Sequence, residues 1–211
     1  MFIFGAMLAT DAYQHLKTTS EGFFKDRGSK FYAHAIPCQN DIDAKAYIDQ
    51  FRKDNPNACH VCFAWRFGEI EQQYKDRFSD DGEPSNSAGK PIFGQIQSFG
   101  LTNILIAVVR YYGGTNLGVG GLITAYKTAS KSALEKAEIV TSFVTNSFEL
   151  LFSYEDMGLV MNLLKKNDIT QIKQEFEGSL AKLIIKVRQS KSEQFSKEMT
   201  QIHTVKFKLL I

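Results

Sequence analysis

Hydrophobic and polar positions alternate along residues 21–37, in two runs that meet around Gly28. Because glycine adopts turn dihedrals that other residues avoid, this segment predicts a β-hairpin. A helix is predicted next, with Asn40 or Asp41 at its start and Pro56 beyond its end. Its apolar positions follow the helical spacing i, i+3, i+4, i+7 and are Ala44, Tyr47, Ile48 and Phe51.

The middle of the chain predicts further strands and another helix. Residues 59–67 alternate as a strand, whereas residues 104–109 are apolar at every position, which is typical of a strand buried on both faces. Gly120 and Gly121 lead into a helix that runs to about Ala137. These elements predict a mixed α/β domain over residues 1–139.

The pattern changes after residue 141. Strand-like alternation begins near Phe148, near Ala181 and near Val205, a weaker strand ends near Phe176, and helical stripes surround Val160 and Met199. The resulting order, βαββαβ, predicts a second domain over residues 140–211, of the ferredoxin-like type, with two helices on one face of an antiparallel sheet. The fold class expected for the whole chain is α+β.

Composition narrows the class of protein further. The chain has 211 residues, of which 44% are hydrophobic and 23% charged, and this excludes collagen-like, coiled-coil and disordered classes. Its formal net charge of +2 gives no global basic field that would indicate nucleic-acid binding. Any partner has to be inferred from local features.

The cellular location is predicted from three features. No apolar stretch approaches the roughly 20 residues that span a bilayer, and residues 1–9 lack the basic start of a secretory signal. The three cysteines, Cys38, Cys59 and Cys62, are an odd number that fits a reducing compartment. We therefore expect a cytoplasmic protein without a membrane partner; whether residues 1–6 belong to the native start stays undecided.

An acidic segment over residues 79–85 is the densest group of polar side chains. Asp80, Asp81 and Glu83 would offer hard oxygen ligands to Mg²⁺, or would hold a basic partner. The alternative interpretation is structural: an acidic turn followed by Ser85 as the N-cap of a helix. Both interpretations remain open at this point.

A glycine-rich segment lies between the buried strand and the helix that follows it. Its five glycines are Gly113, Gly114, Gly118, Gly120 and Gly121. Such a connection can direct backbone N–H groups and the positive end of a helix at an anion, although the spacing matches neither a P-loop nor a dinucleotide fingerprint. The alternative is a tight strand-to-helix crossing. Arg110, which ends the buried strand, would either pair with the acidic segment or face a phosphate.

Other polar residues give weaker signals. Cys59 and Cys62 lie three apart on a predicted strand and point to opposite faces, so they are not a metal half-site. No set of nucleophile, base and orienting group is visible, and we expect neither catalytic residues nor a cofactor. In the second domain the outward positions of two strands carry Lys182, Lys186, Arg188, Lys206 and Lys208. This open face would contact phosphate, or is simply solvated.

Several short motifs together resemble one family, the IMPACT/YigZ family. They are residues 79–85 (SDDGEPS), 88–91 (AGKP), 110–114 (RYYGG), 117–118 (LG), 120–122 (GGL) and 125–126 (AY), with residues 27–31 (RGSKF), His60 and Cys62 upstream. The chain departs from the usual pattern where Asn86-Ser87 replaces Gly-Thr and where Thr124 replaces a common Arg. The missing Arg weakens the case for phosphate binding there.

The resemblance implies a fold and a function. The first domain should share the fold of a small-subunit ribosomal protein and of domain four of elongation factor G, and the second should resemble domain five of that factor. Family members look like translation-linked regulators, and eukaryotic IMPACT makes a non-catalytic protein contact in translation control. The resemblance also implies a motif cluster formed by Asp80, Asp81, Gly82, Glu83, Pro84, Ser85 and Tyr111.

Three functional hypotheses follow. The first is a non-enzymatic translation or stress-response regulator that binds RNA or the ribosome through Lys90, Arg110 and the glycine-rich segment, helped by Lys186, Arg188, Lys206 and Lys208. The second is a Mg²⁺-dependent enzyme, or a binder, for a nucleotide or another phosphorylated small molecule. The third is contact with a protein partner through the acidic segment.

Overall fold

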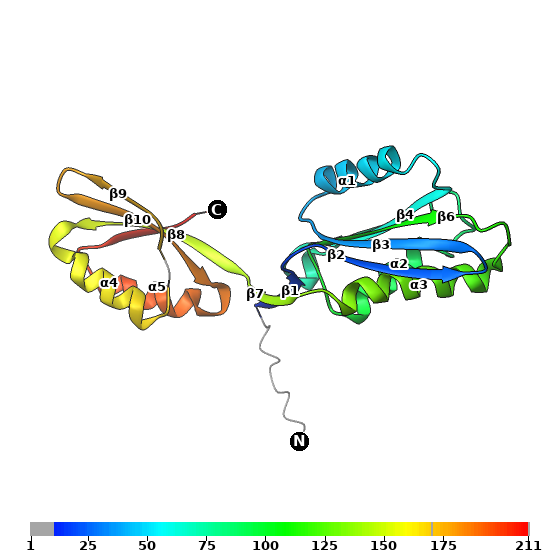
Figure 1. The fold of residues 1–211 in the computed structure, drawn as a ribbon. Helices are drawn as coiled ribbons and strands as arrows, with labels where there is room; N and C mark the ends of the chain where they lie inside the picture. The colour runs from blue at the N-terminus through cyan, green and yellow to red at the C-terminus, as the bar shows by residue number, and fades with distance from the viewer. Residues whose placement is uncertain (1–10, 170, 211) are drawn as a thin grey trace, which may run out of the picture. The chain divides into compact units, whose positions relative to one another are not determined.

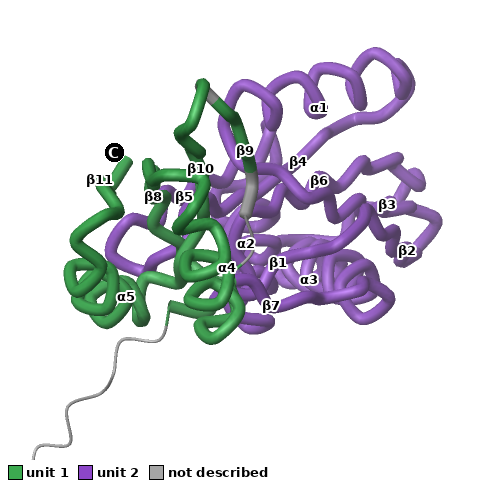
Figure 2. The backbone as a smooth tube through the Cα atoms, turned by 90° about the vertical axis from the view of Figure 1, so that its left-hand side faces the viewer, with its two compact units in different colours: residues 1–12, 143–211 green, residues 13–142 purple. Residues whose placement is uncertain are grey.

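The computed structural model describes residues 11–169 and 171–210 of the chain. It divides into two compact units: residues 13–142, and residues 143–211 together with the segment that ends at Ala12 (Figure 2). The division lies between Ser142 and Phe143, whereas the sequence pattern placed it after Ile139. Strand β7 (Ile139–Phe143) pairs with β1 (Ala12–Leu16), so nearly all of β7 belongs with the unit 13–142.

The unit 13–142 is built on a five-stranded antiparallel sheet with the order β2-β3-β6-β4-β5. Helix α1 lies over one face of this sheet, and α2 and α3 lie over the other (Figure 1). The strands are β2 (Ser20–Asp26), β3 (Ser29–Pro37), β4 (His60–Phe67), β5 (Lys75–Ser79) and β6 (Ile104–Tyr111). The helices are α1 (Asp41–Asp54), α2 (Gly89–Ser98) and α3 (Gly118–Glu135), with a 3-10 turn at Glu71–Gln73.

Strand β6 explains why this unit has two hydrophobic cores. Ile104, Ile106 and Val108 pack with α2 and α3. Leu105, Ala107 and Val109 pack with α1 on the opposite face. Every second residue of a strand points the same way, so a strand between two helical layers has to be apolar throughout. The prediction of a strand buried on both faces is confirmed.

Local signals also placed the first hairpin and helix. Arg27 and Gly28 both have positive φ values, 44° and 81°, which suits the tight turn between β2 and β3. The Asn40 side chain accepts a hydrogen bond of 2.9 Å from the backbone N–H of Asp43, and α1 begins there as predicted. Helix α3 begins at Gly118, slightly before the predicted Gly120.

The second unit has the order βαββαβ. Its elements are β8 (Thr145–Ser153), α4 (Met157–Lys166), β9 (Gln171–Glu177), β10 (Leu180–Arg188), α5 (Ser192–Thr200) and β11 (Lys206–Leu210), with 3-10 turns at Tyr154–Asp156 and Gln189–Lys191. The antiparallel sheet has the order β11-β8-β10-β9. Apolar residues of α4 and α5 pack on the same face of the sheet, which leaves the other face open (Figure 1).

Within the described ranges, no helix combines the length and the apolar character needed to cross a membrane. The expectations about residues 1–6 and about a signal over residues 1–9 fall outside the residues that the structure describes.

Candidate functional site

The acidic and glycine-rich segments meet in space at a pocket, which we call the motif pocket. Its volume is about 440 Å³. Glu83 and Pro84 of the acidic segment form part of its lining, together with Arg110 from the end of β6, and Leu117 and Gly118 from the start of α3. Segments about thirty residues apart in sequence are brought together because β6 lies beside β4 in the sheet and ends next to α3.

Arg110 lines this pocket and is only 6% exposed. One of its terminal nitrogens donates a hydrogen bond to the Glu83 carboxylate, which also accepts one of 2.7 Å from the Tyr126 hydroxyl. Of the two hypotheses for Arg110, the structure shows the pairing with the acidic segment. The Arg110 Nε atom, however, is buried and forms no hydrogen bond with any described residue. Buried donors are normally paired, so this unpaired nitrogen in a residue that lines the pocket is a candidate contact for a ligand.

Two buried polar side chains, Tyr126 and Cys62, extend the hydrogen-bonded group that contains Glu83. The Cys62 thiol lies 3.3 Å from the Tyr126 hydroxyl and donates to the backbone carbonyl of Asp80 at 3.0 Å. Burial raises the pKa of the Cys62 thiol and that of the Tyr126 phenol, so both stay protonated at neutral pH. A thiol held neutral is a poor nucleophile, so the structure gives Cys62 no nucleophilic role at neutral pH.

Asp80 holds the start of α2. One carboxylate oxygen accepts hydrogen bonds from the backbone N–H groups of Ala88 and Gly89, at 2.9 and 2.8 Å, and the other accepts from Asn86 at 2.9 Å. The expectation that Ser85 caps a helix is wrong. The helix begins four residues later, because the carboxylate of Asp80 supplies the cap across the loop.

Asp81 has different partners again. Its carboxylate pairs with Arg52 of α1 at 2.7 Å and accepts the backbone N–H of Val61 at 2.7 Å. Asp80, Asp81 and Glu83 thus point to three separate sets of donors. Among the described residues, no group of three side chains is arranged to hold a metal ion. The geometry therefore gives no support to the Mg²⁺ site proposed for these carboxylates.

The glycines of the second segment serve different purposes. Gly113 packs against the β2–β3 turn: a Cβ there would lie 2.0 Å from the backbone carbon of Gly28, and its N–H donates to the Ser29 hydroxyl at 3.1 Å. Gly114 and Gly118 have φ values of 85° and 72°, which favour glycine. Gly120 and Gly121 lie in the first turn of α3.

The start of α3 faces the motif pocket without a side-chain cap. The first backbone N–H groups of a helix have no partner within it, and the helix dipole makes this end positive. Gly118 and Val119 line the pocket, with space for a ligand around the glycine. The motif pocket thus combines an unpaired guanidinium nitrogen with a positive helix end.

The remaining predicted residues lie elsewhere. Lys90 is exposed in the first turn of α2 and does not line the motif pocket. Tyr111 points to the α1 side of the sheet, where its hydroxyl donates to Asn55 at 2.6 Å. Gly82 has a φ value of 89° and lies beside the His60 ring. Ser85 is exposed.

The basic residues predicted on the second unit do share its open sheet face, but several are paired. Glu149 of β8 lies 2.9 Å from the ammonium group of Lys182 and 3.0 Å from that of Lys208. Arg188 pairs with Asp11 at 2.7 Å. Lys186 and Lys206 are exposed and make no ion pair with any described residue. This surface carries less unpaired positive charge than the sequence predicts.

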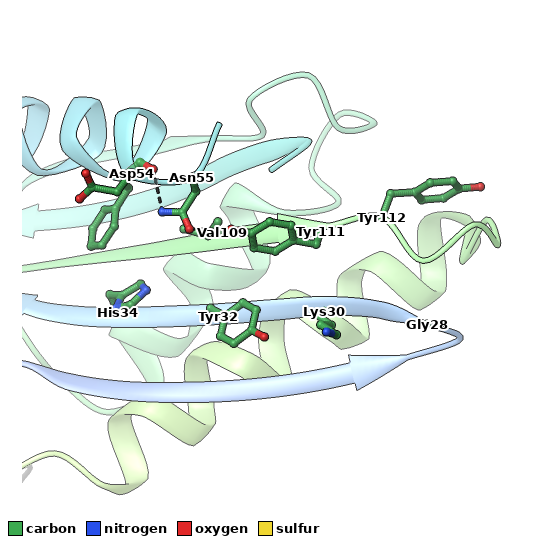
Figure 3. A pocket seen from close by; sticks show the side chains of 10 residues that line it. Gly28, Lys30, Tyr32, His34, Asp54, Asn55, Val109, Tyr111 and Tyr112 are labelled. Atoms are coloured by element: carbon green, nitrogen blue, oxygen red, sulfur yellow. Dashed lines mark hydrogen bonds between the residues drawn. The ribbon is translucent and has the colours of Figure 1, made fainter. Parts of the chain in front are cut away.

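Sequence reasoning missed a larger pocket, of about 650 Å³, on the α1 side of the first sheet (Figure 3). Tyr32, His34, Phe51 and Tyr111 line it, with Lys30 at one end. The signal was present in β3, where Lys30, Tyr32 and His34 alternate with buried residues.

Comparison with known proteins shows the family of the chain. Residues 27–134 match the family model described as "Impact N-terminal domain", and residues 150–202 match "Domain of unknown function (DUF1949)". The chain belongs to the IMPACT family. An IMPACT family member of Haemophilus influenzae is 34% identical over 82% of this chain and 84% of its own length. The IMPACT family member YigZ of Escherichia coli is 32% identical over 79% and 81%.

A solved structure supports the fold of this IMPACT family chain. The structure titled "Crystal structure of an hypothetical protein" is 27% identical, covers 95% of this chain and 98% of its own, and aligns with a TM-score of 0.69. The departure from the family motif at Asn86 also has a physical explanation. Asn86 has a φ of 61°, in the left-handed region that favours glycine, and asparagine is among the residues that tolerate it.

Proposed function

We propose that the protein is a non-enzymatic regulator linked to translation, and that it binds RNA, free or within the ribosome, through phosphate in the motif pocket. Membership of the IMPACT family supports the link to translation. The observation that carries phosphate binding is the buried Arg110 Nε, which has no partner in the described part of the chain and belongs to a pocket that is also lined by the uncapped start of α3. Guanidinium nitrogens and helix starts are both frequent phosphate contacts.

The domain types fit this role. The element order of the second unit and its strand order β11-β8-β10-β9 support a ferredoxin-like assignment. The assignment of the unit 13–142 to the fold of a small-subunit ribosomal protein and of domain four of elongation factor G remains part of the proposal, as does a cytoplasmic location. The enzyme hypothesis is not favoured, because the three carboxylates that it needs are directed to separate partners.

The test introduces a negative charge at the motif pocket and leaves the buried contacts of Arg110, Glu83 and Tyr126 unchanged. Val119 is 52% exposed and lines the motif pocket in the first turn of α3. The variant Val119→Glu should fold normally, because an acidic side chain near a helix start is favourable. It should weaken RNA binding about five- to tenfold at low salt, through repulsion of phosphate. Fluorescence anisotropy with labelled RNA or ribosomal particles measures this.

The matched control is Ile123→Glu, the same charge change one turn along α3. Ile123 is 38% exposed and is not among the residues that line the pocket. It should bind RNA nearly as tightly as the unmodified protein, and the affinity of both should fall steeply as salt rises. The proposal fails if no RNA or ribosome binding is seen at about 50 mM salt, or if the two variants bind equally. Retention of a protein partner after nuclease treatment would then favour a protein contact.

A further inference from the structure

One face of the first sheet is left partly uncovered. Helix α1 packs over β4 and β6, while the outward residues of β2 and β3 stay accessible. Phe23 of β2 and Tyr32 of β3 are directly opposite each other, with ring centroids 4.9 Å apart and exposed fractions of 45% and 37%. We call this surface, formed by Phe23, Tyr32, His34 and Tyr111, the aromatic face.

The rings of the aromatic face are held in place by contacts with α1 and with Asn55, the residue that follows it. The Tyr111 ring meets the Tyr32 ring edge to face at 5.9 Å, and the hydroxyl of Tyr111 is fixed by Asn55. His34 stacks on Phe51 of α1 with centroids 4.5 Å apart. Figure 3 shows Tyr32, His34 and Tyr111 along this side of the sheet. The rings are therefore oriented before any ligand arrives, which lowers the entropic cost of binding.

Positive charge lies next to the rings. Lys25 and Lys30 are opposite each other in the β2–β3 pair, and Arg27 lies in the turn that joins these strands. All three are exposed, and none forms an ion pair with another residue in the described part of the chain. Like charges directly opposite in a sheet destabilise it. A negatively charged ligand would offset that repulsion, whereas an apolar protein surface would not.

We propose that the aromatic face binds unpaired RNA, with bases stacked on Tyr32 and Phe23 and with phosphates near Lys25 and Lys30. Sheet faces that bind single strands combine rings for stacking with a basic border, because every base has a π-face and every linkage a charge. A duplex keeps its bases stacked inside and cannot use the rings. This inference rests on the proposed function and specifies the ligand as single-stranded.

The test distinguishes base stacking on the Tyr32 ring from simple burial of an apolar side chain. Full-length protein is titrated into a labelled 12-nucleotide single strand and into the matching duplex, with anisotropy as the readout. Tyr32→Leu retains an apolar side chain but loses the ring, and it should weaken single-strand binding about tenfold. Tyr32→Phe retains the ring and should bind like the unmodified protein. Duplex binding should be weaker and should respond little to either change.

Tyr154→Leu is the matched control, since Tyr154 is 66% exposed in the other unit. It should leave single-strand affinity unchanged. The inference is overturned if Tyr32→Leu binds as tightly as Tyr32→Phe, or if duplex and single strand are lost equally. A loss with Val119→Glu but none with Tyr32→Leu overturns this inference alone. The reverse pattern overturns phosphate binding in the motif pocket and retains the aromatic face.

Discussion

The two units differ in how the basic residues of their candidate binding surfaces are paired. In the unit 13–142 the pair between Arg110 and Glu83 is buried at the lining of a pocket, and three basic side chains at the end of the β2–β3 hairpin have no acidic partner among the described residues. In the second unit the pairs of Glu149 lie on the open sheet face itself. The number of basic residues on a surface is therefore a poor guide to its electrostatic field. The positions of the acidic partners decide how much positive charge stays unpaired and can attract a ligand.

The largest expected effect comes from breaking the buried pair. Glu83→Ala leaves the Arg110 guanidinium without its carboxylate and Tyr126 without its acceptor. We expect a loss of about 3–5 kcal/mol in the free energy of unfolding. Urea denaturation followed by tryptophan fluorescence measures it, because Trp65, the single tryptophan of the chain, lies in this unit.

The control for Glu83→Ala is Glu71→Ala, at an exposed position of the 3-10 turn in the same unit. It should leave the tryptophan transition within about 0.5 kcal/mol. Equal losses for the two variants would contradict a structural role for the buried pair.

A smaller effect is expected at the ion pair of Asp11 in the second unit. Asp11 accepts hydrogen bonds from Arg188 and from the N–H and hydroxyl of Ser190. Asp11→Asn should lower the free energy of unfolding of this unit by about 2 kcal/mol. Far-UV circular dichroism reports it, while the tryptophan transition should not move.

The same pair predicts a pH dependence. Hydrogen bonds from Arg188 hold the pKa of the Asp11 carboxyl well below its ordinary value of 3.8. A lowered folded-state pKa stabilises the protein above the ordinary pKa, and this contribution is lost as the pH falls from there through the folded-state pKa. Below about pH 4, Asp11→Asn and the unmodified protein should therefore approach each other in stability. A difference that stays constant into the acid range would contradict this.

The smallest effect on stability is expected for Glu149→Gln. This variant directly tests the comparison between the candidate binding surfaces of the two units. This change removes the carboxylate that the ammonium groups of Lys182 and Lys208 contact. Because these groups are at the surface, unfolding should change little. RNA affinity at low salt should rise, and the slope of log affinity against log salt should steepen by about one. An unchanged slope would show that this face takes no part in binding.

The sequence was informative where structure depends on near neighbours. The β2–β3 turn, the Asn40 cap and the apolar run of β6 all follow from residues within one element, and each was predicted. The interpretation with Ser85 as the cap misplaced the start of α2, because the actual cap, Asp80, lies eight residues before Ala88 and reaches it only through the folded loop. The strands β1, β5 and β7 were not predicted.

The candidate site shows the same limit. Motif resemblance selected Arg110, Glu83 and Gly118, and the structure brings them to one pocket. The sequence left two partners open for Arg110, since the choice depends on how β6 and the acidic segment meet. It also grouped Lys208 with Lys206 on a basic face without revealing that Glu149, across the β8–β11 pairing, neutralises one of them.

Tyr112 lines both the motif pocket and the pocket beside the aromatic face. Its ring is 48% exposed, and its hydroxyl donates to Asn116 at 3.2 Å in the loop that leads to α3. The two cavities therefore share one wall residue. A substitution at Tyr112 would change the lining of both cavities at once, so only residues that line one of them, such as Val119 or Tyr32, can tell the two proposed contacts apart.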